Sequence, residues 1–122
     1  MIKIKVSMAY NEELASRIRM ALNFFPPSVT ENLEEKKMFG GLAFLYRGKM
    51  TVGIVKSDLM VRVPATKMDA VLSKKHVRPM DFTNRPLKEF IYVSEEGFNN
   101  EEKLQQWIEL GIEHAKNKSD SK

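Results

Sequence analysis

Three short apolar runs separated by turn residues constrain the fold of this chain more than any other feature. Residues 38–46 are apolar on both faces apart from two glycines, as in a central strand. Residues 50–54 and 59–63 alternate like strands with two different faces. The links 47–49 and 56–58 have hairpin length, and the first contains the glycine that tight turns favour. The pattern predicts a three-stranded antiparallel meander.

Helical patterns flank this meander. Asn11 precedes two glutamates, which predicts a capped helix whose apolar stripe reaches Phe25 before two prolines end it. Residues 28–35 are polar and acidic, and we expect a loop there. A short helix is predicted over 65–74, and a long one begins at Asn99 or Asn100.

Two further strands complete the predicted order. Residues 76–82 contain Pro79, which favours an edge strand, and residues 89–93 form a strong β run. Gly111 lies on the apolar stripe of the last helix, where we expect it to allow close approach of a neighbour. The order is α-β-β-β-α-β-β-α. The predicted fold class is α+β: two layers, with an antiparallel five-stranded sheet and helices on one face.

Length and composition limit the kind of protein that this chain can be. A chain of 122 residues fits one domain, and we expect an N-terminal extension over 1–7, the domain over 8–117 and a disordered tail over 118–122. There is no cysteine, which excludes disulfides and thiolate zinc sites and suits the cytoplasm. No apolar run approaches the ~18 residues of a membrane span, so no membrane partner is expected.

The net charge of +4 is unevenly distributed, with a basic middle and an acidic C-terminal segment. Lysines and arginines are less densely clustered than in dedicated nucleic-acid binders. Nucleic acid is therefore a weakly supported partner.

Several motifs in order resemble one family. They are KKMFGGLAFLYRGKM, DLMVRV and RPMDFTNRPLKEFIYV, with MAYNEELASRIR at the start and EEKLQQWIELGIEHA in the last helix. Together they resemble the N-terminal domain of bacterial TfoX/Sxy proteins over roughly residues 8–117. The resemblance implies an α+β fold similar to secretion chaperones. It also implies kinship with regulators of competence for DNA uptake, whose longer members carry a second domain.

The glycine pair Gly40-Gly41 has two interpretations. Its backbone N–H groups, with Lys37 and Arg47 nearby in sequence, form a candidate anion site. Neither GxxxxGK[ST] nor GxGxxG is present, and the glycines lead into a strand instead of a helix. The alternative, which we favour, is a β-bulge or a close packing contact.

Charged residues in the strands form a second candidate site. Asp81 can fix Arg78 or Arg85 and leave the other arginine for an acidic ligand, or the group can be a structural ion pair. Arg62 interrupts an apolar strand, and we expect it on the sheet face away from the helices.

Two other groups of residues are candidate binding surfaces. Met50, Met60 and Met80 are a candidate adaptable surface for apolar partner segments if they are exposed together; otherwise they fill the core. Residues 74–78, KKHVR, are the densest basic cluster, able to contact phosphate or to complement a helix C-terminus.

No sequence pattern indicates catalysis. HExxH and GxSxG are absent, and the two histidines fall in different predicted elements, so we expect no metal, no cofactor and no enzyme activity. The leading hypothesis is a small regulatory or adaptor domain that binds another protein or itself. The alternatives are a nucleic-acid-associated domain with a basic sheet face and, less favoured, an enzyme or small anionic-ligand binder with a site around Arg62, Arg78, Asp81 and Arg85.

Overall fold

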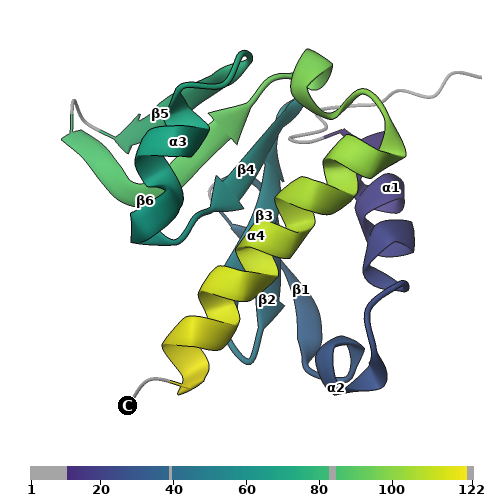
Figure 1. Ribbon diagram of the computed structural model, residues 1–122. Helices are drawn as coiled ribbons and strands as arrows, with labels where there is room; N and C mark the ends of the chain where they lie inside the picture. The colour runs from purple at the N-terminus through teal and green to yellow at the C-terminus, as the bar shows by residue number, and fades with distance from the viewer. Residues whose placement is uncertain (1–10, 39, 83–84, 121–122) are drawn as a thin grey trace, which may run out of the picture.

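The predicted meander forms the centre of a larger sheet. The computed structural model describes residues 11–38, 40–82 and 85–120, and the side chains of 80–82, 85–88 and 118–120 are outside this description. The strands are β1 (Leu33–Met38), β2 (Gly41–Tyr46), β3 (Lys49–Val55), β4 (Asp58–Arg62), β5 (Val77–Phe82) and β6 (Arg85–Val93). They form one antiparallel sheet in the order β1-β2-β3-β4-β6-β5 (Figure 1).

Helices make up the second layer. They are α1 (Glu12–Leu22), α2 (Pro27–Thr30), α3 (Met68–Leu72) and α4 (Glu101–Asp120), with 3-10 turns η1 (Ala65–Lys67) and η2 (Glu95–Phe98). α4 runs diagonally across the sheet, α1 lies beside its N-terminal end, and α3 lies beside β5 and β6 (Figure 1). The two-layer α+β prediction is confirmed.

The predicted number of strands was wrong: the sheet has six, not five. The additional strand is β1, in the segment assigned to a loop and to the start of the next strand. β1 pairs with β2 so that Met38 lies opposite Gly41. The run 38–46 is therefore the turn and second strand of a hairpin. β1 carries four consecutive charged residues, so it has no apolar alternation by which a sequence pattern reveals a strand.

Side-chain caps fix the starts of both long helices. The Asn11 side-chain oxygen accepts hydrogen bonds from the backbone N–H groups of Glu13 (2.9 Å) and Leu14 (3.1 Å). The Asn100 side-chain oxygen accepts one from Lys103 N–H at 2.8 Å. These bonds satisfy donors that a helix N-terminus leaves without partners, which confirms the predicted start of α1 and resolves that of α4.

The main core lies between α4, α1 and one face of the sheet. Ile18 of α1, Ile54 of β3 and Ile108 of α4 are fully buried in it. A Cβ on Gly111 would lie 2.5 Å from the backbone oxygen of Thr51 in β3, so glycine lets α4 approach the sheet backbone. This confirms the role predicted for Gly111. No helix in the described part of the chain is long and apolar enough to cross a membrane.

Both edges of the sheet resist further strand pairing. β1, at one edge, presents consecutive charges, and Glu35 there is bound by Arg19 of α1 at 2.6 Å. β5, at the other edge, contains Pro79 and a register shift between Pro79 and Asp81. Charges, proline and bulges are the usual means of protecting an exposed edge. The prediction of an edge strand around Pro79 is confirmed.

Candidate functional site

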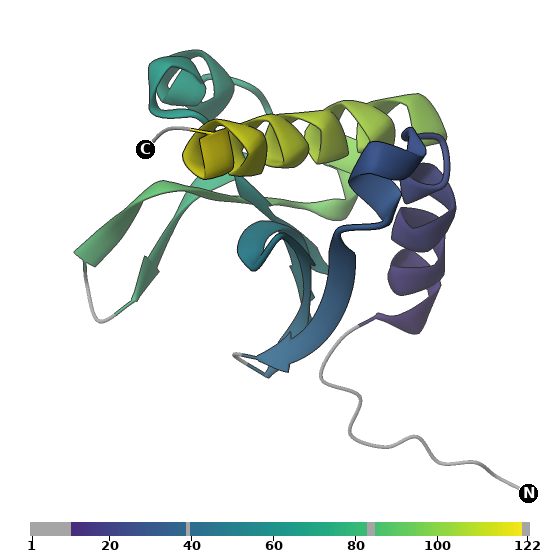
Figure 2. The same ribbon diagram turned by 90° about the horizontal axis from the view of Figure 1, so that it is seen from below.

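The sheet face opposite the helices brings together several residues singled out in the sequence. In Figure 2 the flanks of the sheet bend away from α4, so that this face is concave. Within the described residues no helix covers it, and we call it the helix-free face. The register aligns one residue from each strand across it: Lys36, Ala43, Gly53, Met60, Tyr92 and Arg78.

A small apolar cluster occupies the centre of the helix-free face. Its buried members are Ala43, Leu45, Met50 and Met60, and Met38, Val55, Phe90 and Tyr92 are half-buried around them. This cluster is separate from the main core, because alternate residues of each strand point to opposite faces. The half-buried rim leaves part of its apolar side-chain surface accessible on this face.

Arg62 lies on the helix-free face, as expected. Its guanidinium carbon is 4.5 Å from the centre of the Phe90 ring, a cation–π arrangement. Its Nε is buried and has no hydrogen-bond partner among the described residues. Burial lowers the pKa of Arg62 from its usual value, and the charge of Glu89 partly opposes that shift. Arg62 is thus a partly desolvated cation with unused hydrogen-bonding capacity.

Arg78 of β5 repeats this arrangement on the other side of β6, the strand that bears both aromatic rings. Its guanidinium carbon is 4.7 Å from the centre of the Tyr92 ring, and it donates to Asp58 of β4 at 2.6 Å. Asp58 is a partner that sequence reasoning missed. Its spacing from Met60 and Arg62 placed it on the same face, but nothing local indicated that β4 and β5 flank β6. The predicted partners Asp81 and Arg85 have side chains outside the described set.

The predicted methionine surface is not present in the form proposed. Met50 is 7% exposed and Met60 is 1% exposed, so both fill the centre of the cluster and do not present an exposed patch. The Met80 side chain lies outside the described set. Flexible thioethers suit such a position because they fill irregular gaps.

The structure does not bring the predicted glycine site together. Gly40 lies in the β1–β2 turn with φ +74°, a conformation that glycine adopts without strain. A Cβ on Gly41 would overlap the backbone oxygen of Ile54, which confirms the close-contact interpretation for that residue. Lys37 is exposed near this turn, whereas Arg47 lies at the opposite end of β2, over the Tyr46 ring. Gly40 and Arg47 therefore do not converge on one anion.

The two histidines occupy different environments. His76 is exposed after α3, whereas His114 of α4 is 3% exposed and lies 2.6 Å from a carboxylate oxygen of Glu89. Among the described residues, no group of three or more His, Cys, Asp or Glu side chains could hold a metal ion. The His114–Glu89 contact ties α4 to β6, which bears Phe90 and Tyr92.

Comparison with known proteins gives one match. The sequence model described as the TfoX N-terminal domain matches residues 28–115. This chain belongs to the TfoX N-terminal domain family. The match extends from α2 through most of α4, so it includes every described residue of the helix-free face. No curated protein and no solved structure matches the chain.

Membership of the TfoX N-terminal domain family confirms the resemblance seen in the sequence. The arrangement that this example of the domain presents is an apolar sheet face crossed by arginines that lie on aromatic rings. Such a face can bind a surface of opposite charge and partly apolar character.

Proposed function

We propose that this domain is a small regulatory adaptor without catalytic activity, which binds a partner protein on its helix-free face. Kinship with the TfoX N-terminal domain supports a regulatory role related to competence. The observation that carries the proposal is Arg62: a cation held half-buried on an aromatic ring, with its Nε unused. Leaving a buried donor unpaired is unfavourable, and a partner carboxylate would relieve that penalty.

The face suits a partner better than either edge does. Binding by strand addition needs an accessible edge, and both edges are protected by charges or by proline and a register shift. The helix-free face instead offers half-buried Phe90 and Tyr92 beside Arg62 and Arg78. Aromatic residues and arginine are the residue types enriched where interfaces gain most of their binding energy.

The chemistry of the face indicates the partner. Arg78 already has a carboxylate partner in Asp58, whereas Arg62 Nε has none among the described residues. The complementary surface would present one acidic side chain to Arg62 and apolar side chains to Met38, Val55 and Phe90. We therefore infer an acidic, partly apolar segment of another protein, with a second copy of this chain as the other outcome of the test.

The test compares two double variants in affinity capture from the source lysate. Arg62→Met/Arg78→Met removes both arginine charges from the face, and Arg47→Met/Lys116→Met removes two charges elsewhere. We expect a partner to be retained by the wild type and the control but lost with the first variant. The retained protein, once identified, is purified and its binding to the wild type and both variants is measured directly.

Two results would contradict the proposal. One is that no protein distinguishes the two double variants although both give the wild-type circular dichroism spectrum. The other is that the purified partner binds both variants equally. Light scattering over a range of concentrations tests the alternative occupant, since a dimer that is lost only in Arg62→Met/Arg78→Met would identify a second copy.

Single-stranded nucleic acid is the second candidate, and one observation favours it. Arginines alternate with aromatic rings on the face, an arrangement that single-strand binders use for phosphates and stacked bases. However, the guanidinium groups already lie on the Phe90 and Tyr92 rings, where bases would stack. A fluorescent oligonucleotide should bind with log K falling by about 0.7 per phosphate contact as log salt rises. No binding in ~50 mM salt would remove this candidate.

A further inference from the structure

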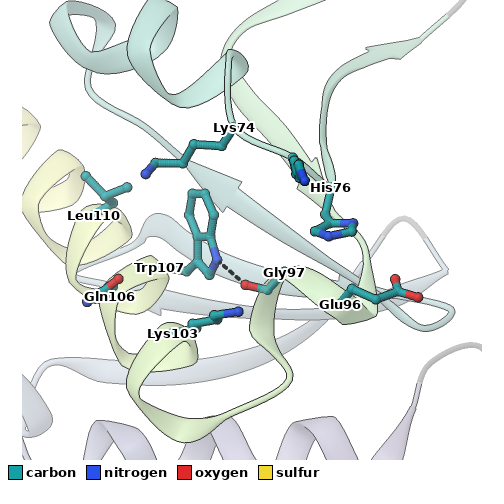
Figure 3. A pocket seen from close by; sticks show the side chains of 9 residues that line it. Lys74, His76, Glu96, Gly97, Lys103, Gln106, Trp107 and Leu110 are labelled. Carbon is teal, nitrogen blue, oxygen red and sulfur yellow. Dashed lines mark hydrogen bonds between the residues drawn. The ribbon is translucent and has the colours of Figure 1, made fainter.

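The helical side of the molecule contains a pocket that is separate from the helix-free face and plays no part in the proposed binding of a partner. It lies between the first half of α4, the turn η2 and the segment that follows α3, and its volume is about 430 Å³. Figure 3 shows Trp107 and Leu110 of α4 against Lys74 and His76 on the opposite wall. The pocket is therefore built from segments about 30 residues apart in the chain.

The walls of the pocket are fixed by hydrogen bonds. The indole N–H of Trp107 donates to the backbone oxygen of Gly97 in η2 at 2.9 Å, which fixes the ring (Figure 3). The backbone N–H of Ser94 donates to the backbone oxygen of His76 at 2.9 Å and joins the two sides. His76 has φ +69°, a conformation that non-glycine residues rarely adopt and that concentrates at functional sites. The pocket is preformed.

The pocket has an excess of positive charge. Lys74, Lys75 and Lys103 line it, against a single acid, Glu96. Within the described residues none of these lysines is in an ion pair, and Lys103 has only a long contact of 3.5 Å to the Asn99 side chain. Lys67, close to Lys74 and Lys75 in sequence, is instead paired with Glu113 at 2.8 Å. Exposed like charges repel one another weakly in water, and an anion bound between the three lysines would offset that repulsion.

The other two described hollows lack this excess. One is lined by Arg17, which is paired with Glu101, and by the acids Glu13 and Glu95. The other is lined by Arg19, which is paired with Glu35. Both are smaller, at about 250 and 200 Å³. The combination of size, unpaired cations and an aromatic wall is thus specific to the Trp107 pocket among these three.

We propose that the Trp107 pocket binds a small organic anion that carries a planar ring and a phosphate or carboxylate group. Its volume falls in the range of about 300–1,000 Å³ typical of small-molecule sites and exceeds what a bare inorganic ion needs. Trp107 and Leu110 provide the apolar wall for the ring. Lys74, Lys75 and Lys103 neutralise the anionic group, and the Gln106 amide can hydrogen-bond a polar ring substituent.

This site is independent of the proposed partner surface. None of its lining residues belongs to the helix-free face, and the two are made by different elements. The sequence cluster KKHVR is divided between them: Lys74, Lys75 and His76 line the pocket, whereas Arg78 lies on the sheet. One site can therefore fail its test while the other passes.

The test uses the intrinsic fluorescence of Trp107, which is the single tryptophan of the chain. The probes are adenosine 5′-monophosphate and 1-naphthoate, which combine a ring with a phosphate or a carboxylate, and adenosine and inorganic phosphate, which each lack one part. We expect a saturable change with at least one ring-bearing anion at a Kd of about 1 mM or lower. The single-part probes should bind at least about tenfold more weakly, because each loses one set of contacts.

Matched variants locate the binding. Lys74→Gln/Lys103→Gln should weaken the probe by about tenfold or more, whereas Lys49→Gln/Lys116→Gln, with the same change in charge away from the pocket, should change it less than about twofold. All four lysines are exposed, so folding should persist, and circular dichroism checks this. Arg62→Met/Arg78→Met should leave the titration unchanged. The proposal is overturned if no ring-bearing anion gives a saturable signal, or if both lysine pairs have equal effects.

Discussion

The two faces of the sheet are built from the same strands but buried by different means. On the helix-covered face, branched aliphatic side chains such as Val52, Ile54 and Leu59 lie fully buried under α4. On the other face, Ala43 and Met60 are equally buried, but their neighbours come from the sheet itself and from arginines laid over aromatic rings. Burial by a second layer stabilises the fold, whereas burial by rim residues leaves part of the apolar surface accessible, as the proposed partner surface requires.

The comparison predicts unequal consequences for side chains of equal burial. Ile108→Ala, on α4, should lower the free energy of unfolding by about 4 kcal/mol, because the surrounding helices and strands hold the cavity open. Met60→Ala should lower it by about 2 kcal/mol, because the helix-free face can relax or admit water. Urea unfolding followed by circular dichroism measures both.

Equal losses in these two variants would break the comparison. They would mean that the small cluster is packed as tightly as the main core and is not adapted to rearrange around a partner. Val55→Ala, a half-buried position on the rim, serves as the control and should lower stability by about 1 kcal/mol or less.

Gly111 tests how closely the helical layer must approach. Gly111→Ala places a methyl group 2.5 Å from the backbone oxygen of Thr51, and a strand backbone in the sheet centre cannot move away easily. We expect a loss of about 2 kcal/mol despite the higher helix propensity of alanine, which alone would stabilise by about 1 kcal/mol. The control is Lys116→Ala, on an exposed part of α4, which should leave stability within about 0.5 kcal/mol. A net gain at Gly111 would show that α4 shifts freely.

The parts of the fold also differ in how well the sequence predicts them. Period-2 alternation identified the strands of the meander, and the asparagine caps identified both long helices, because these signals are local. β1 was missed because an edge strand with four consecutive charges has no apolar period. The face of Arg62 was predicted correctly, since an unpaired charge among apolar residues must point away from the core.

What the sequence could not predict depends on long-range placement. Asp58 and Arg78 pair because β4 and β5 both flank β6, and no local pattern encodes that order. Trp107 of α4 is largely buried, at 7% exposed, but its indole also forms a pocket wall opposite Lys74. The basic cluster was recognised, whereas its aromatic partner lies on another element.

Substitution of Arg62 can distinguish an effect on stability from an effect on binding of the proposed partner at the helix-free face. Burial lowers the pKa of this arginine, which means that its charge is less well stabilised there than in water. Arg62→Met removes that charge and keeps an apolar stem on Phe90, so stability should change by less than about 1 kcal/mol in either direction. Affinity for the partner should nevertheless fall about tenfold, which corresponds to about 1.4 kcal/mol.

Urea unfolding and direct binding to the identified partner measure these two effects in the same protein. Arg47→Met, in the β2–β3 turn, is the matched control and should change neither. A stability loss above about 2 kcal/mol in Arg62→Met would instead assign Arg62 a structural role.

The smallest expected effect concerns the ion pair that joins the edge strand β1 to α1. Arg19 of α1 binds Glu35 at 2.6 and 2.8 Å, and this hydrogen bonding lowers the pKa of Glu35 from 4.5, against the opposing effect of burial. A carboxylate with a lowered folded-state pKa stabilises the protein above its unfolded-state pKa, and this stabilisation disappears as the pH falls through the folded-state value. Because the Glu35 side chain is 38% exposed, solvent screens the ion pair and the contribution should be only about 0.5 kcal/mol. Glu35→Gln should therefore be less stable than the wild type at pH 7, and the gap should close below the folded-state pKa. Urea titrations at a series of pH values from 7 downwards measure the gap, with Glu34→Gln, on the opposite face of β1, as the control. A gap that does not narrow at all as the pH falls would show that Glu35 acts through packing and not through its charge.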